Sequence, residues 1–260
     1  MSKYAKWIGG GLGWAVGGPI GAMAGFALGA LFDNASGIDE RRLSGNQNRG
    51  RTNTDAGDFG MSMVILSAAV MKADGKVMRS ELDYVKKFFL QQFGELRAKE
   101  LVAALKEVLE HEVSIRQVCM QIRANMDHSS RLQLLHYLFG IGYSDGKVSP
   151  QDLHVLNTMA RYLGISQKDF YSINAMFGGA GYQYSTYQRR KPDLKAAYQI
   201  LEVDQKATDD EVKKAYRRLV HKHHPDRVSH LGPDFTKAAK EKFQKIQEAY
   251  DQVKTSRGIR

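Results

Sequence analysis

The residues with the clearest chemical potential lie near the carboxyl end, where His224, Pro225 and Asp226 follow a strongly basic segment. Pro225 disfavours helical geometry at the residue before it, so we expect a helix to end here and the triplet to lie in a loop. The sequence contains no recognisable nucleophile–base pair or phosphate-binding loop, and it does not indicate an enzyme. The available chemistry is recognition through charge, which suits nucleic acid, anionic lipid or an acidic protein surface.

An amphipathic helix must position this loop. Thr208 is a candidate N-cap, and the acidic residues 209–211 fill the first turn of the helix that follows. Apolar side chains recur along this helix at the spacing of one buried face, and cations recur on the opposite face. We call the cationic face the basic ridge; it comprises Lys213, Lys214, Arg217, Arg218, His221 and Lys222. A short helix at 194–201 and a last helix at about 235–253 complete the predicted helical hairpin.

This pattern resembles the J domain. The segments that carry the resemblance are AYQIL at 197–201, EVKKAYRRL at 211–219, the His-Pro-Asp triplet and FQKIQEAY at 243–250. The resemblance implies that the basic helix docks on an acidic surface of an ATP-state Hsp70 and that the loop biases Hsp70 toward hydrolysis. On this interpretation Asp226 makes the ionic contact, Pro225 fixes the loop and His224 orients it. The basic contacts would be Lys213, Lys214, Arg217, Arg218 and Lys222.

The chain departs from the J-domain family in two respects. Glu202 stands where the family usually has glycine after the first helix, and we expect this change to affect a helix end and not the docking loop. No Gly/Phe-rich region follows the domain, and the single cysteine, Cys119, cannot build a cysteine-rich zinc module. These absences indicate a specialised, location-restricted member of the family.

The middle of the chain, residues 58–177, has helical periodicity throughout and predicts about seven helices. It contains an internal repeat: ADGKVMRSEL at 73–82 returns as SDGKVSPQDL at 144–153, each copy lying between two apolar helical segments. The doubled motif in an all-helical region resembles the TerB-like (tellurite-resistance B) fold.

The acidic residues of the repeat allow two interpretations. Asp74 and Glu81 in one copy, and Asp145 and Asp152 in the other, could bind Ca²⁺ or Mg²⁺ if the two copies face each other. However, Ser149 followed by proline and an acid at the third position looks like a capped helix start. The ligand pattern of an EF-hand is also incomplete, so we expect the structural role over a divalent-cation site.

The amino-terminal residues 7–31 carry no charged side chain, and this length can cross a bilayer as a helix. Two lysines precede the segment and four arginines follow it within about 20 residues, which favours a cytoplasmic carboxyl end. Glycine recurs at every fourth position and would form one smooth stripe for self-association of two helices. The stripe comprises Gly13, Gly17, Gly21, Gly25 and Gly29.

The order of these parts is similar to that of the DjlA-type membrane co-chaperones of Gram-negative bacteria. The resemblance implies an all-α protein with Hsp70 (DnaK) as partner, a bilayer anchor and a homodimer formed through the span. It places the protein in the bacterial inner membrane, with a short periplasmic amino terminus and cytoplasmic carboxyl-terminal domains. The predicted parts are a flank at 1–6, a transmembrane helix at 7–31, a flexible linker at 32–57, a TerB-like domain at 58–177, a linker at 178–191 and a J domain at 192–260.

Two other functions are compatible with parts of the sequence. The protein could be an envelope-stress or metal-sensing interaction protein that works through the TerB-like domain, with the J domain as a recruiter. Alternatively, the tyrosines beside the cations at 189–191 could stack on single-stranded nucleic acid, but no accompanying module would read bases, so we expect no nucleic-acid partner. Apart from the possible cation, we expect no cofactor.

Overall fold

The described structure is helical. A computed structural model of the chain describes residues 54–178 and 194–258, and these residues contain no strand. The all-α prediction is confirmed for this part of the chain. The predicted span at 7–31, its glycine stripe and nearly all of the linker at 178–191 lie outside the described residues. Among the helices that are described, none is both long and apolar enough to cross a membrane.

The first unit comprises six helices. They are α2 (Thr54–Met71), α3 (Arg79–Leu109), α4 (Ile115–Asn125), α5 (His128–Gly142), α6 (Pro150–Tyr162) and α7 (Gln167–Gly178). We predicted about seven helices here, and the difference lies in α3. Gly94 interrupts this helix with φ 75° and ψ 172°, so two helical segments meet at a kink that only glycine adopts without strain.

Helix α5 forms the centre of the first unit. Every residue from Leu132 to Gly142 is buried, so the helix is covered on all sides and not on one face only. Helices α2, α3, α6 and α7 all contact it. The rings of Phe139, Tyr143, Phe170 and Phe177 lie close together on its α7 side, with Phe139 and Phe177 stacked at 5.8 Å between centroids.

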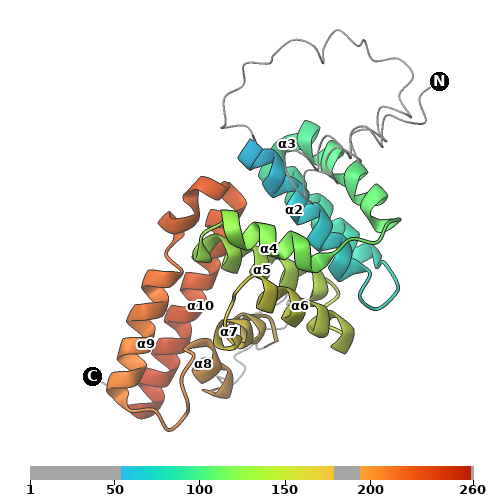
Figure 1. Cartoon of the computed structure of the whole chain (residues 1–260). Helices are drawn as coiled ribbons and strands as arrows, with labels where there is room; N and C mark the ends of the chain where they lie inside the picture. The colour runs from blue at the N-terminus through green and yellow to red at the C-terminus, as the bar shows by residue number, and fades with distance from the viewer. Residues whose placement is uncertain (1–53, 179–193, 259–260) are drawn as a thin grey trace, which may run out of the picture.

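The second unit is a helical hairpin with a short helix beside it. Its elements are α8 (Leu194–Ile200), α9 (Asp209–Lys222), the 3₁₀ helix η2 (Pro225–Leu231) and α10 (Pro233–Arg257). The predicted apolar stripe of α9 is confirmed, because Val212, Ala215 and Leu219 are buried. Stacking of Tyr216 on Tyr250, with centroids 4.1 Å apart, joins α9 to α10. Figure 1 shows these two helices side by side.

The two units share their apolar cores. Phe235, at the start of α10, belongs to the core of the first unit, and its ring lies 5.3 Å from the rings of both Phe59 and Phe88. In the opposite direction, Met176 of α7 belongs to the core of the second unit. Helix η2 contacts α5, and α8 contacts α7. The end of the hairpin that carries the His-Pro-Asp triplet is therefore packed against the first unit.

Replacement of Phe235 by alanine should strongly destabilise the protein. The side chain is 1% exposed, and its loss leaves a cavity between two aromatic rings, so we expect the free energy of unfolding to fall by about 3–5 kcal/mol. Urea denaturation of the full chain followed by circular dichroism measures this change. Leu96→Ala is the control: this side chain is 83% exposed, and its loss should change stability by about 0.5 kcal/mol or less. Similar losses for the two variants would contradict the shared core.

Candidate functional site

The His-Pro-Asp triplet forms a capped turn. His224 has the extended backbone that the following proline predicts, with φ −63° and ψ 132°. Its Nδ1 accepts a hydrogen bond from the backbone N–H of Asp226 at 3.3 Å and lies 3.5 Å from the Asp226 carboxylate. The imidazole meets the ring of Phe243 edge-on, 6.0 Å between centroids, so α10 supports it from behind. The Asp226 side chain is 90% exposed and is free to contact a partner.

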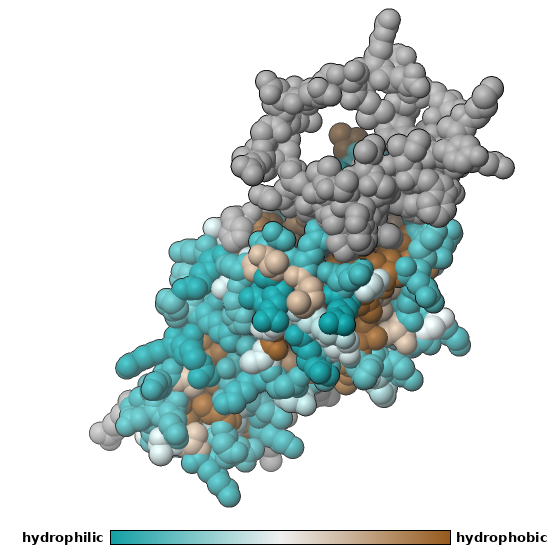
Figure 2. Space-filling model, viewed as in Figure 1, coloured by the Kyte–Doolittle hydropathy of each residue, from teal (hydrophilic) through white to brown (hydrophobic). Residues whose placement is uncertain are grey.

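Helix α9 presents the basic ridge next to this turn. Its predicted N-cap is confirmed: Thr208 accepts from the backbone N–H of Glu211, and the Glu211 carboxylate accepts from the backbone N–H of Thr208 at 2.7 Å. The hydrogen bonds that the Glu211 carboxylate accepts from the backbone N–H and from the hydroxyl of Thr208 lower its pKa. Lys214, Arg217 and Arg218 are exposed, and Lys213 is half-buried. On the face shown in Figure 2, hydrophilic side chains dominate around α9.

A groove lies between the ridge and the turn. Its lining residues are Tyr216, Arg217, Val220, His221, His224 and Arg227. The Arg227 guanidinium lies 3.1 Å from Nε2 of His221, which links η2 to the last turn of α9. Our sequence analysis did not identify Arg227 as a site residue, although a cation directly after Asp226 was a visible signal. The basic surface thus continues around the loop beyond the end of the helix.

Two members of the ridge have carboxylate partners within the chain. The Arg218 guanidinium lies 2.9 Å from the Glu202 carboxylate. Lys222 forms an ion pair with Asp169 of α7 and lies 3.9 Å from Glu202. Glu202 stands just after the end of α8, as we expected, but its side chain also reaches the ridge and is 4% exposed.

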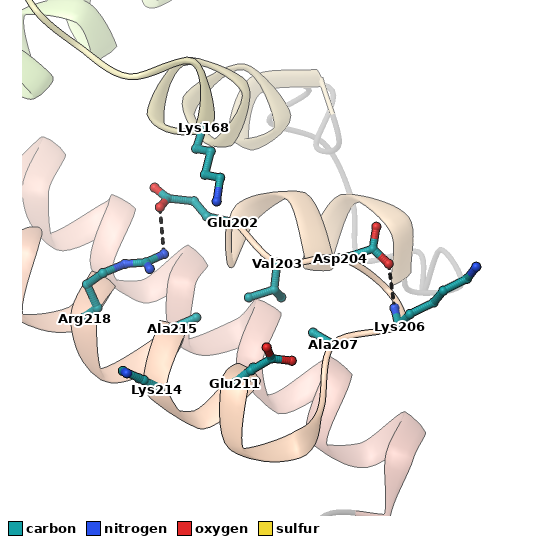
Figure 3. Close-up of a pocket in the computed structure, with 10 residues that line it drawn as sticks. All are labelled: Lys168, Glu202, Val203, Asp204, Lys206, Ala207, Glu211, Lys214, Ala215 and Arg218. Carbon is teal, nitrogen blue, oxygen red and sulfur yellow. Dashed lines mark hydrogen bonds and ion pairs between the residues drawn. The ribbon is translucent and has the colours of Figure 1, made fainter.

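A second cleft lies between α7, the loop after α8 and α9. Figure 3 shows Glu202 pointing toward Arg218 of α9, with Lys168 extending from α7 into the same part of the cleft. Lys206 and Lys214 also line it. The cleft brings charged residues of both units together, although sequence analysis placed them in separate domains.

The acidic residues of the repeat act as turn and cap acceptors. Asp74 accepts from the backbone N–H of Lys76 at 2.9 Å, and Asp145 accepts from that of Lys147 at 3.0 Å. The carboxylates at the helix starts accept backbone N–H groups three residues earlier, Glu81 from residue 78 and Asp152 from residue 149. The described part of the chain holds no group of three or more His, Cys, Asp or Glu side chains that could bind a metal ion. The four carboxylates thus have the structural role of turn and cap acceptors that we expected, and a cation at Asp74, Glu81, Asp145 and Asp152 stays a prediction.

The two copies of the repeat nevertheless face each other. Burial raises the pKa of Glu81 to about 7, although the hydrogen bond from Met78 opposes this shift, and the charges of Asp152, Asp74 and Asp145 add to it. The folded protein thus binds a proton at Glu81 more tightly than the unfolded chain does. The tighter proton binding at Glu81 stabilises the folded protein. This stabilisation is complete below the ordinary pKa of 4.5 and is lost as the pH rises through about 7.

We expect Glu81→Gln to stabilise the protein at pH 8 and to leave it nearly unchanged at pH 4.5. Glutamine keeps an oxygen acceptor for the backbone of Met78 and cannot ionise, so the gain at pH 8 should be about 1 kcal/mol after solvent screening. Thermal unfolding at the two pH values measures it, with the exposed Glu110→Gln as control. An effect of Glu81→Gln that does not depend on pH would contradict the buried carboxyl.

The helical hairpin, the His-Pro-Asp turn and the basic ridge define a J-domain protein, and comparison with known families agrees. The family model of the DnaJ domain matches residues 196–258, and that of the tellurite resistance protein TerB matches 61–175. A third model, the co-chaperone DjlA transmembrane domain, matches residues 1–49, a range that includes the predicted span. The chain belongs to the DjlA family of membrane-anchored co-chaperones.

Curated relatives match over most of the chain. The chain is 30% identical to co-chaperone protein DjlA of Vibrio vulnificus over 78% of this chain and 79% of the relative. It is 28% identical to the Haemophilus influenzae protein over 99% of both chains, and 28% identical to that of Yersinia pestis over 94% of both. No solved structure matches. The similarities drawn from the sequence to TerB, the J domain and DjlA are confirmed, and they group the chain with co-chaperones.

Proposed function

We propose that this protein stimulates ATP hydrolysis by a bacterial Hsp70 (DnaK) through its J domain. The observation that carries the proposal is the capped turn, which holds the Asp226 carboxylate in solvent beside the basic ridge. His224 restrains the turn through its hydrogen bond to the backbone of Asp226, and Pro225 fixes the backbone before it. Asp226 would then pair with a cation on the partner, without a large ordering cost on binding.

The partner surface that fits the ridge is acidic. Lys214, Arg217 and Arg218 are exposed on one face of α9, with Lys213 beside them, and Arg227 extends the positive surface past the loop. Charge complementarity of this kind raises the association rate and fixes orientation more than it raises affinity. We therefore expect association with Hsp70 to weaken as salt rises.

The groove between Tyr216 and Val220 supplies an apolar centre for the same contact. It lies between the cationic side chains of Arg217 and Arg227 and next to His224. Stable protein interfaces commonly combine an apolar centre with a charged rim. The arrangement supports docking of a protein surface in preference to a polyanion, which would need only the cations.

The activity needs no covalent step on this chain. A J domain that binds the hydrolysis-competent state of Hsp70 more tightly than the other states shifts the population toward it, by no more than the difference in binding free energy. The residues of the turn and the ridge would supply this difference. The ATPase residues belong to the partner.

His224→Gln should abolish stimulation. Glutamine lacks the ring that caps the turn and meets Phe243, so the Asp226 carboxylate loses its fixed position. In single-turnover ATP hydrolysis by bacterial Hsp70, with the full chain in detergent micelles, we expect the stimulated rate to fall by roughly tenfold or more, a loss of at least about 1.4 kcal/mol.

The matched control for this variant is His154→Gln, an exposed histidine of α6 outside the J domain. It should stimulate Hsp70 like the wild type. Absence of stimulation by the folded wild-type chain, or full stimulation by His224→Gln, would contradict the proposed function.

We also propose the topology and assembly that the sequence favours. The span at 7–31 would cross the inner membrane once, with residues 1–6 in the periplasm and the domains at 58–177 and 192–260, joined by the linker at 178–191, in the cytoplasm. The linker at 32–57 would separate the domains from the bilayer. The glycine stripe would allow two spans to approach closely and form a homodimer.

Gly21→Leu should weaken self-association, because a large side chain at the middle of the stripe separates the two helix backbones. Energy transfer between donor- and acceptor-labelled full chains in lipid vesicles measures the effect, and we expect it to fall severalfold. Ala15→Leu adds the same side chain away from the stripe and should leave the signal unchanged. Equal signals for Gly21→Leu and wild type would rule out association through the stripe.

A further inference from the structure

The contact between the TerB-like domain and the J domain contains a buried set of charges. Asp169 of α7 has a side chain only 3% exposed, and it accepts hydrogen bonds from Ser166 at 2.7 Å and from Lys222 of α9. Burial alone would raise the pKa of Asp169, but the bonds from Lys222 and Ser166 outweigh it and lower the pKa. Asp169 is thus an anion in the folded protein and holds a cation that belongs to the basic ridge.

Glu202 is the second carboxylate of this set. Its φ is 59°, a left-handed conformation that glycine adopts freely and that other residues rarely adopt. The side chain is 4% exposed, lies 2.9 Å from Arg218 and approaches Lys222 at 3.9 Å. A glutamate at a position whose backbone suits glycine implies that its carboxylate contributes through these contacts.

Two further basic side chains, Lys242 and His223, are buried at the same contact. Lys242 of α10 is fully buried without a hydrogen-bond partner, and Asp169, Glu202 and Lys222 are the charges that act on it. The buried His223 also faces Lys242 and Lys222. Around this group, Ser129 donates to the backbone carbonyl of Lys222 at 3.4 Å. These groups therefore lie where the two domains meet. Asp169 provides most of the compensating negative charge, because burial and the charge of Asp169 raise the pKa of Glu202.

We propose that Asp169 and Glu202 form an intramolecular latch that holds Lys222 and Arg218 of the basic ridge and so competes with the acidic surface of Hsp70 for them. The inference rests on the proposed function, because the competition requires that surface. The latch carboxylates do not pair with the other ridge cations, Lys213, Lys214 and Arg217. These cations stay available for the first contact with Hsp70. Full engagement of the ridge requires the release of Lys222 and Arg218. Through Asp169, the TerB-like domain thereby limits the affinity of the J domain for its partner, and Glu202 of the J domain acts in the same direction.

Two substitutions open the latch in different ways. Asp169→Asn removes the charge that pairs with Lys222. Glu202→Gly removes the charge that pairs with Arg218 and at the same time relieves the left-handed backbone, so it should not unfold the domain. The control is Asp204→Asn, which removes one negative charge from the same cleft. Among the described residues, the Asp204 carboxylate accepts only from the nearby backbone N–H of Lys206.

The first measurement is the concentration of full chain, in detergent micelles, that half-maximally stimulates single-turnover ATP hydrolysis by bacterial Hsp70. We expect this concentration to fall roughly threefold to tenfold for Asp169→Asn and for Glu202→Gly, and to stay unchanged for Asp204→Asn. The second is the rate at which an amine-acylating reagent modifies Lys242, with the exposed Lys237 and Lys240 as internal references. Both latch variants should raise this rate.

The outcomes separate the two proposals. Stimulation by the wild type with unchanged half-maximal concentrations for both variants overturns the latch and leaves the proposed function intact. An unchanged acylation rate of Lys242 in both variants overturns the role of the two carboxylates in holding the domains together. A wild-type chain that does not stimulate Hsp70 at all overturns the proposed function, and the competition with it.

Discussion

The insertion of Phe235 into the core of the TerB-like domain constrains the rest of this structure. Phe235 lies in the first turn of the last helix, soon after the His-Pro-Asp turn, and its ring lies 5.3 Å from the rings of both Phe59 and Phe88 of the other domain. Leu231 packs against the same core, and the side chain of Gln92 donates to its backbone carbonyl. The segment after the turn is therefore held both by apolar packing and by a hydrogen bond to its backbone. The TerB-like domain thus holds the segment that follows the turn, while the Asp226 side chain of the turn itself lies in solvent.

Charge is distributed around this fixed segment in two layers. Cations on the outer face of α9 and at Arg227 lie in solvent and can meet a partner. On the inner side, Lys222 pairs with Asp169 of the TerB-like domain and approaches Glu202. Burial lowers the pKa of Lys242 to about 7, although the charges of Asp169 and Glu202 oppose this shift. Buried ion pairs of this kind add little net stability, since desolvation offsets much of the attraction, but they favour one arrangement of the domains. The basic ridge thus belongs both to the docking face and to the domain contact.

Local features of this protein could be predicted from its sequence, whereas contacts between distant segments could not. The cap at Thr208, the helix end before Pro225 and the capping box at Ser149 each depend on residues within a few positions, and the structure confirms them. The ion pair of Lys222 with Asp169 joins residues 53 positions apart, and no periodicity or motif indicates it. Gly94 was also missed, because a glycine in a helical pattern does not by itself show a kink. The repeat acids were ambiguous, since capping and cation binding use the same carboxylates.

The most direct test of this account is hydrogen–deuterium exchange of the full chain in detergent micelles, followed at the hydrogen-bonded backbone amides of Arg227, Gly232 and Thr236. A protected backbone amide exchanges when the cooperative unit that contains it opens, so its exchange rate reports the free energy of that opening. If the TerB-like domain holds the segment after the turn, these amides should exchange nearly as slowly as those of the buried helix α5. Exchange at the rate of an exposed turn, with α5 still protected, would show that the segment moves independently, and it would contradict the claim that the two domains form one packed structure.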